Sequence, residues 1–95
     1  MTMLLTKETI QDVLVAMPGW KFVEGKRIEK EFSFDSFLDA TAFVNRVAGM
    51  SEGVQHHPDI DIRYTMVRVA LSTHDAGGVT EKDIDSANSI ETLVC

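Results

Sequence analysis

The chain has 95 residues, with nine Lys and Arg against fifteen Asp and Glu, a formal net charge of −6 and a pI near 4.8. This acidic balance argues against direct binding to nucleic acid, which depends on cationic side chains that neutralise phosphates. Apolar residues make up 44% of the chain, and no apolar run approaches the ~18 residues of a membrane span. We therefore expect one globular domain over residues 1–95 with no membrane contact.

The only cysteine, Cys95, is the last residue. One thiol cannot form a disulfide within the chain. Near the N-terminus no basic segment precedes an apolar run of the secretory type. Together these features favour a reducing, cytoplasmic location.

The first predicted element is a helix. Thr6 is a suitable N-cap, and Pro18 with Gly19 ends the pattern. Between these points the apolar residues recur at the spacing of one helical face. They are Ile10, Val13, Leu14 and Met17.

A hairpin is predicted next, with strands at 20–23 and 26–34 and a tight turn at Glu24-Gly25. Apolar and polar residues alternate along the second strand, as they do in a sheet with one buried face. Lys30 interrupts this alternation. The hairpin is nevertheless the reading that the pattern favours.

A second helix is predicted to begin after Ser36, where Asp39 completes a capping-box-like start and Asp35 is the alternative cap. Pro58 disfavours the helical conformation at the residue before it, so the helix should end by about His56. A broad apolar stripe along this helix should face the core. Its members are Phe37, Ala40, Thr41, Phe43, Val44, Val47, Ala48 and Met50.

Two further strands, at 59–64 and 66–73, are predicted to form a second hairpin because apolar and polar residues alternate in both. Thr80 and Asp83 then have the spacing of a capping box that opens a last helix. The residues expected to face the core in this half are Ile60, Ile62, Tyr64, Val67, Val69, Leu71, Thr73, Ile84, Ala87, Ile90 and Val94.

The predicted order of elements is α-β-β-α-β-β-α. Strands paired locally in hairpins imply an antiparallel sheet, and amphipathic helices imply that one face of it is covered. The fold class is therefore α+β, a two-layer sandwich of a four-stranded antiparallel sheet with three helices packed on one face. Such a sheet has open edge strands, which favour pairing with a second copy and hence a homo-oligomer.

All three histidines, His56, His57 and His74, lie in the second half of the chain. Converging imidazoles can supply both a proton donor and a proton acceptor near neutral pH. Glu52 precedes His56 by four residues, which on a continuous helix places the two side chains on one face. Such a pair would favour the charged form of His56 and make it the better candidate acid.

Other chemistries fit these residues less well. Glu52 and the histidines could ligate a metal, but their spacing is not that of HExxH and one cysteine excludes the usual zinc frameworks, so no metal site is expected. We interpret Asp59 and Asp61 as solvated charges on an open strand face. Gly77-Gly78 lacks the phosphate-binding patterns, and no serine lies in a GxSxG elbow.

The spacing of these residues resembles the signature of the pterin-4a-carbinolamine dehydratases. The matching positions are Glu52 with His56-His57-Pro58, then Tyr64, the run Ser72-Thr73-His74-Asp75-Ala76-Gly77-Gly78, and Asp83. The likeness covers roughly residues 18–92. Ile60 stands where some members have a tryptophan.

The resemblance implies a dehydratase (hydro-lyase). Its substrate would be the 4a-hydroxytetrahydropterin that aromatic amino acid hydroxylases produce, and its product quinonoid dihydropterin, as part of tetrahydrobiopterin recycling. It further implies a homodimer or homotetramer, with the pterin as substrate and no separate cofactor. The alternative is a non-catalytic dimerisation or transcription-coactivator module on the same fold, as in some relatives.

By position, the resemblance also assigns the site residues. The catalytic residues would be His56, His57 and His74, with His57 mainly in pterin binding and proton exchange. The substrate-binding residues would be Gln55, Ser72, Thr73 and Asp75. Glu52 and Asp83 would support the histidines, and Asp83 could equally serve only as a helix cap.

Overall fold

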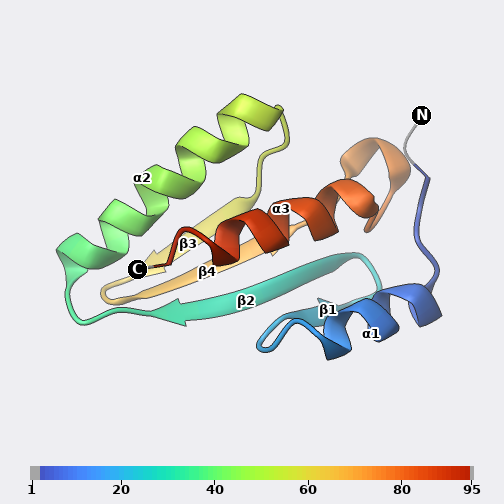
Figure 1. The fold of residues 1–95 in the computed structure, drawn as a ribbon, viewed down its shortest axis with the longest axis horizontal. Coiled ribbons are helices and arrows are strands. Elements are labelled where there is room, and N and C mark those ends of the chain that lie inside the picture. Colours follow the sequence, from blue (N-terminus) through green and yellow to red (C-terminus); the bar gives the residue numbers. More distant parts are fainter. Residues whose placement is uncertain (1–2, 95) are drawn as a thin grey trace.

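The computed structural model describes residues 3–94, so Cys95 lies outside the described part. The fold has three α-helices and a four-stranded sheet, which confirms the predicted α+β class (Figure 1). The elements are α1 (Lys7–Val15), β1 (Lys21–Val23), β2 (Arg27–Ser33), α2 (Phe37–Val54), β3 (Asp59–Arg63), β4 (Met66–Leu71), the 3₁₀ turn η1 (His74–Ala76) and α3 (Glu81–Glu91). Within residues 3–94, none of the helices has the length and apolar character to cross a membrane.

The strands lie in the order β1-β2-β4-β3, and every neighbouring pair is antiparallel. The central pair joins the two hairpins, with Ile28 opposite Leu71 and Phe32 opposite Val67. These side chains face the helices and are buried, because successive residues of a strand point to opposite faces. The other face carries charged residues, among them the cross-strand pair Asp61 and Arg68.

One cluster of buried apolar side chains fills the space between the helices and the sheet. Phe43 of α2 is fully buried, and its ring lies 4.9 Å from that of Phe32 and 5.0 Å from that of Phe34, measured between centroids. α1 contributes Ile10 and α3 contributes Ile90. The three helices therefore share one core with β2 and β4.

Tyr64 is a correction to the predicted strand face. We expected it to face the core, but β3 ends at Arg63, and Tyr64 is 75% exposed with a φ of 55° in the connection to β4. The short connection requires a left-handed residue there, so the alternation cannot continue. Four other residues expected to face the core are also exposed: Phe37, Ala48, Ile62 and Val94.

Lys30 breaks the strand alternation because it lies on the covered face of β2, between Ile28 and Phe32. Its ammonium reaches the end of α3, where Nζ is 2.7 Å from Oε2 of Glu91. The same oxygen accepts a hydrogen bond of 2.9 Å from the indole Nε1–H of the buried Trp20. Glu91 thus fixes the C-terminal end of α3 to the sheet.

We predict that Glu91→Ala lowers the free energy of unfolding by about 1–3 kcal/mol, because the buried Trp20 indole would lose the carboxylate that accepts its hydrogen bond. Urea denaturation measures this change. Glu24→Ala is the matched control. This substitution removes the ion pair between Glu24 and Arg27, which is exposed, so it should lower the free energy of unfolding by less than about 1 kcal/mol. Equal effects of the two substitutions would contradict the prediction.

Candidate active site

The two adjacent histidines lie in the link between α2 and β3. α2 ends at Val54, and Gln55 adopts the left-handed conformation with φ 54° and ψ 42°. The amide side chain of Gln55 also donates to the carbonyl of Glu52 at 2.7 Å. The backbone therefore leaves the helix just before His56, which agrees with the predicted end by about His56.

His56 faces the interior, where it meets the buried carboxylate of Asp83 in the first turn of α3. Nε2 of His56 lies 2.6 Å from Oδ1 of Asp83, and the Asp83 side chain has no exposed surface. Its other oxygen, Oδ2, accepts from the backbone N–H of Thr80 and the hydroxyl of Thr73, each at 2.9 Å. Asp83 thus caps α3 and also contacts His56.

His57 faces outward, and its partner is Glu52. Nε2 of His57 lies 2.7 Å from Oε1 of Glu52, and the two side chains are 56% and 74% exposed. The hydrogen bond from His57, and then its charge, hold the pKa of Glu52 below its ordinary value.

The expected pairing of Glu52 with His56 is therefore wrong. A spacing of four residues brings two side chains together only while the helix continues. Because the left-handed Gln55 ends the helix between them, Glu52 meets His57 instead.

All three histidines line one cavity of about 430 Å³, which is within the size range of small-molecule sites. Its lining residues come from the α2–β3 link, the end of β4 with η1, and the first turn of α3. Figure 1 shows these segments toward one end of the sheet. Its lining consists of Gln55, His56, His57, Pro58, Asp59, Ser72, Thr73, His74, Asp75 and Lys82. Glu52 and Asp83 do not line the cavity; each contacts a histidine that does.

Thr73 differs from the other expected substrate contacts. Its side chain is buried, with 7% of the residue exposed, and its hydroxyl is bonded to Asp83 and lies 2.7 Å from that of Thr80. Its backbone N–H is bonded to the carbonyl of Gly78. Thr73 therefore borders the cavity with its polar groups already engaged.

The sequence did not single out Asp59 and Lys82 as residues of this cavity. Asp59 was interpreted as a solvated strand charge, although it directly follows the His-His-Pro corner. Lys82 had one local signal: it is a cation in the first turn of a helix, where acidic residues are favoured. Its proximity to the histidines depends on the packing of α3, which no local pattern shows.

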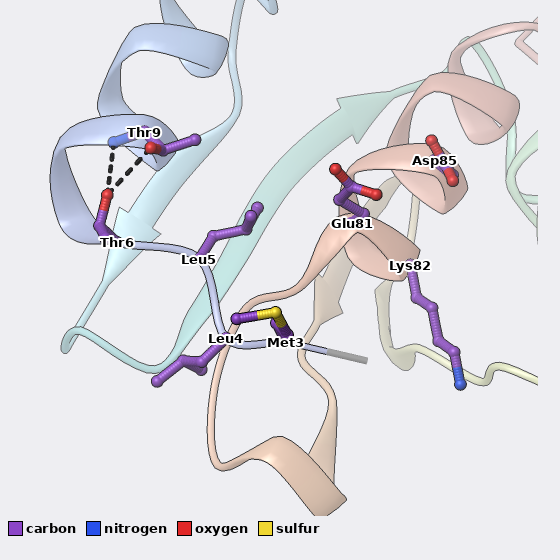
Figure 2. A pocket seen from close by; sticks show the side chains of 8 residues that line it. All are labelled: Met3, Leu4, Leu5, Thr6, Thr9, Glu81, Lys82 and Asp85. Atoms are coloured by element: carbon purple, nitrogen blue, oxygen red, sulfur yellow. Dashed lines mark hydrogen bonds between the residues drawn. The ribbon is translucent and has the colours of Figure 1, made fainter. Parts of the chain in front are cut away.

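A larger cavity, of about 580 Å³, lies between the N-terminal segment and α3 (Figure 2). It has no histidine. Its lining consists of Met3, Leu4, Leu5, Thr6, Thr9, Glu81, Lys82 and Asp85. Its hydroxyls, on Thr6 and Thr9, are bonded to each other. The three imidazoles all line the smaller cavity, which we therefore take as the candidate active site. Among residues 3–94, no three His, Cys, Asp or Glu side chains form a metal-ligand group.

Comparison with known proteins identifies the family. The sequence model of one protein family, described as pterin 4 alpha carbinolamine dehydratase, matches residues 3–93 of this chain. The chain belongs to this family. The resemblance found in the sequence is thus confirmed, and the family supports pterin carbinolamine dehydratase activity in general.

Curated relatives match along nearly their full length. A provisionally named pterin-4-alpha-carbinolamine dehydratase of Acidobacterium capsulatum is 52% identical over 90 residues, covering 95% of this chain and 97% of the relative. A relative with the same provisional name from Thermosynechococcus vestitus is 47% identical over 89 residues, which cover 94% of this chain and 93% of the relative.

Two solved structures share the fold of this pterin carbinolamine dehydratase family member. A transcriptional coactivator/pterin dehydratase from Brucella melitensis has a TM-score of 0.90 and 35% identity, with 96% of this chain and 98% of that chain covered. A pterin dehydratase-like protein identified as a RuBisCO assembly factor in the alpha-carboxysome has a TM-score of 0.69 and 25% identity. The match covers 82% of this chain and 92% of that chain.

We predict that His57→Ala raises the pKa of Glu52 toward its ordinary value of 4.5, because the carboxylate loses both a hydrogen bond and a neighbouring positive charge. Carbon-13 NMR titration of the glutamate carboxyl groups measures this. His74→Ala is the control and should leave the Glu52 titration unchanged. A Glu52 pKa that stays low in His57→Ala would show that another group is responsible.

Proposed function

We propose that this chain removes water from 4a-hydroxytetrahydropterin to give quinonoid dihydropterin, in the recycling of tetrahydrobiopterin for aromatic amino acid hydroxylases. The observation that carries the proposal is the cavity itself, which three imidazoles line and where two of these imidazoles contact a carboxylate. Family membership gives the reaction class.

The reaction requires two proton transfers. One proton goes to the 4a hydroxyl oxygen, so that the C4a–O bond breaks and its electron pair leaves with water. The proton on N5 is removed, and the N5–H electron pair becomes the second bond between N5 and C4a. One acid near the 4a hydroxyl oxygen and one base near N5 therefore suffice.

His57 is the better candidate for the acid, in place of His56. The lowered pKa of Glu52 keeps its carboxylate ionised, and this carboxylate lies 2.7 Å from Nε2 of His57, where it can compensate the charge of an imidazole that donates a proton to the leaving oxygen. The N5 proton then passes to another imidazole of the cluster. His74 lines the cavity from η1 and serves pterin binding.

We predict that His56→Ala and His57→Ala each lower kcat/KM by at least about tenfold, since acid/base assistance contributes roughly 10²–10⁴-fold. The assay supplies 4a-hydroxytetrahydropterin from a pterin-dependent hydroxylase and follows quinonoid dihydropterin by absorbance, with circular dichroism to show that each variant is folded. Arg63→Ala, at the end of β3 distant from Asp59, is the control and should retain full activity. A fully active variant lacking both His56 and His57 would contradict the mechanism.

We also predict a homodimer or homotetramer in solution. β1 and β3 are edge strands, each hydrogen-bonded on one side only, and such edges favour pairing with another copy. Light scattering should give a mass of two or four chains. A mass of 10.6 kDa, that of one chain, would contradict this prediction.

The competing function is a binding module without catalysis. It is favoured by the two solved neighbours, one called a transcriptional coactivator/pterin dehydratase and the other an assembly factor. In this chain Leu38, at the start of α2, is an exposed apolar residue of the kind that a partner could cover. Activity of the wild-type chain in the dehydration assay, lost in the histidine variants, would exclude a purely non-catalytic role.

A further inference from the structure

The hydroxyls beside Asp83 form a hydrogen-bond chain with one direction. Thr73 Oγ1 lies 2.7 Å from Thr80 Oγ1 and 2.9 Å from Oδ2 of Asp83. A threonine hydroxyl has one proton to donate, whereas a carboxylate can only accept. Thr73 therefore donates to Asp83, and Thr80 donates to Thr73. Thr80 Oγ1 in turn accepts the backbone N–H of Lys82 at 3.3 Å.

The direction of these hydrogen bonds determines whether Asp83 accepts or donates a hydrogen bond in its contact with His56. Oδ2 of Asp83 already accepts from Thr73 and from the backbone N–H of Thr80, so its charge is stabilised by two donors within a fully buried site. The remaining oxygen, Oδ1, faces Nε2 of His56 at 2.6 Å. An ionised carboxylate at that distance requires a proton on Nε2.

We propose that Thr73 and Thr80 are positioning residues that hold Asp83 as an acceptor and so fix His56 in the Nε2–H tautomer, leaving Nδ1 as the atom that accepts the N5 proton. This inference rests on the proposed dehydration. Neutral imidazole carries its lone pair on the nitrogen without the proton, which is then Nδ1. The His56 side chain retains 14% exposure and lines the cavity, so the ring is accessible from it.

The proton transfer balances with this assignment. The N5–H bond breaks, its proton joins Nδ1 of His56, and its electron pair forms the N5=C4a bond. The C4a–O pair leaves with the hydroxyl oxygen, which takes a proton from His57 and departs as water. The positive charge that develops on His56 lies against the carboxylate of Asp83, which is already oriented to stabilise it.

Thr73 provides the sharpest test, because two roles for it make different predictions. If it contacted substrate, its loss would raise KM. As a positioning residue it should act on kcat, through the tautomer of His56. Thr73→Val removes the donor with little change in shape, Thr73→Ser keeps it, and Thr41→Val is the control because it removes a threonine hydroxyl bonded only to the carbonyl of Leu38 in α2.

Nitrogen-15 NMR of histidine-labelled protein, without substrate and at a pH where the imidazoles are neutral, reads the tautomer directly. We expect wild-type His56 to carry its proton on Nε2. Thr73→Val should raise the Nδ1–H form and lower kcat roughly tenfold with KM little changed, the scale of one hydrogen bond to a charged group. Thr73→Ser should stay within about threefold of wild type, and Thr41→Val should match wild type in both measurements.

The outcomes separate this inference from the proposed function. Wild-type His56 protonated on Nδ1 would overturn the inference even in an active enzyme, and that measurement needs no variant to fold. A Thr73→Val variant that raises KM alone, with the wild-type tautomer, would also overturn it. If the tautomer is as expected but wild type shows no dehydration, the proposed function fails, and with it the role of His56 as base.

Discussion

The carboxylate of Asp83 is fully buried, and an ion in that position is stable only when donors surround it. Three donors do so, from three parts of the chain: Thr73 after β4, Thr80 before α3, and His56 after α2. The same contacts that compensate the buried charge therefore fix the α2–β3 link and the end of β4 against α3. The geometry of the candidate site and the local fold therefore both depend on the carboxylate of Asp83.

Much of the fold follows from local pattern. The Thr80 and Asp83 spacing predicted the capping box that the structure shows, and the alternation along 66–71 predicted the buried face of β4. Lys30 did not fit, because an alternation rule assumes that an inward residue is apolar. Its long aliphatic stem packs on the covered face while the ammonium reaches Glu91, a partner distant in sequence.

The sequence predicted which residues belong to the candidate site better than it predicted the contacts between them. Resemblance to the family indicated most of the residues that line the cavity, including Ser72 and Asp75, but not Asp59 or Lys82. It did not indicate which carboxylate meets which histidine, since that depends on the conformation of a single residue, Gln55. Nor could it show that Thr73 directs its hydroxyl to a buried aspartate, because that contact requires α3 to be packed beside the end of β4.

The adjacent histidines His56 and His57 lie in different dielectric surroundings. The His57–Glu52 pair is open to water and dissolved ions, whereas the His56–Asp83 pair is largely shielded from both. Mobile salt screens exposed charges over roughly 8–10 Å at physiological ionic strength and acts much less on buried ones. Dissolved salt therefore weakens the attraction between His57 and Glu52 more than the contact between His56 and Asp83. In the proposed mechanism, ionic strength then acts mainly on the proton transfer from His57 and much less on the transfer to His56.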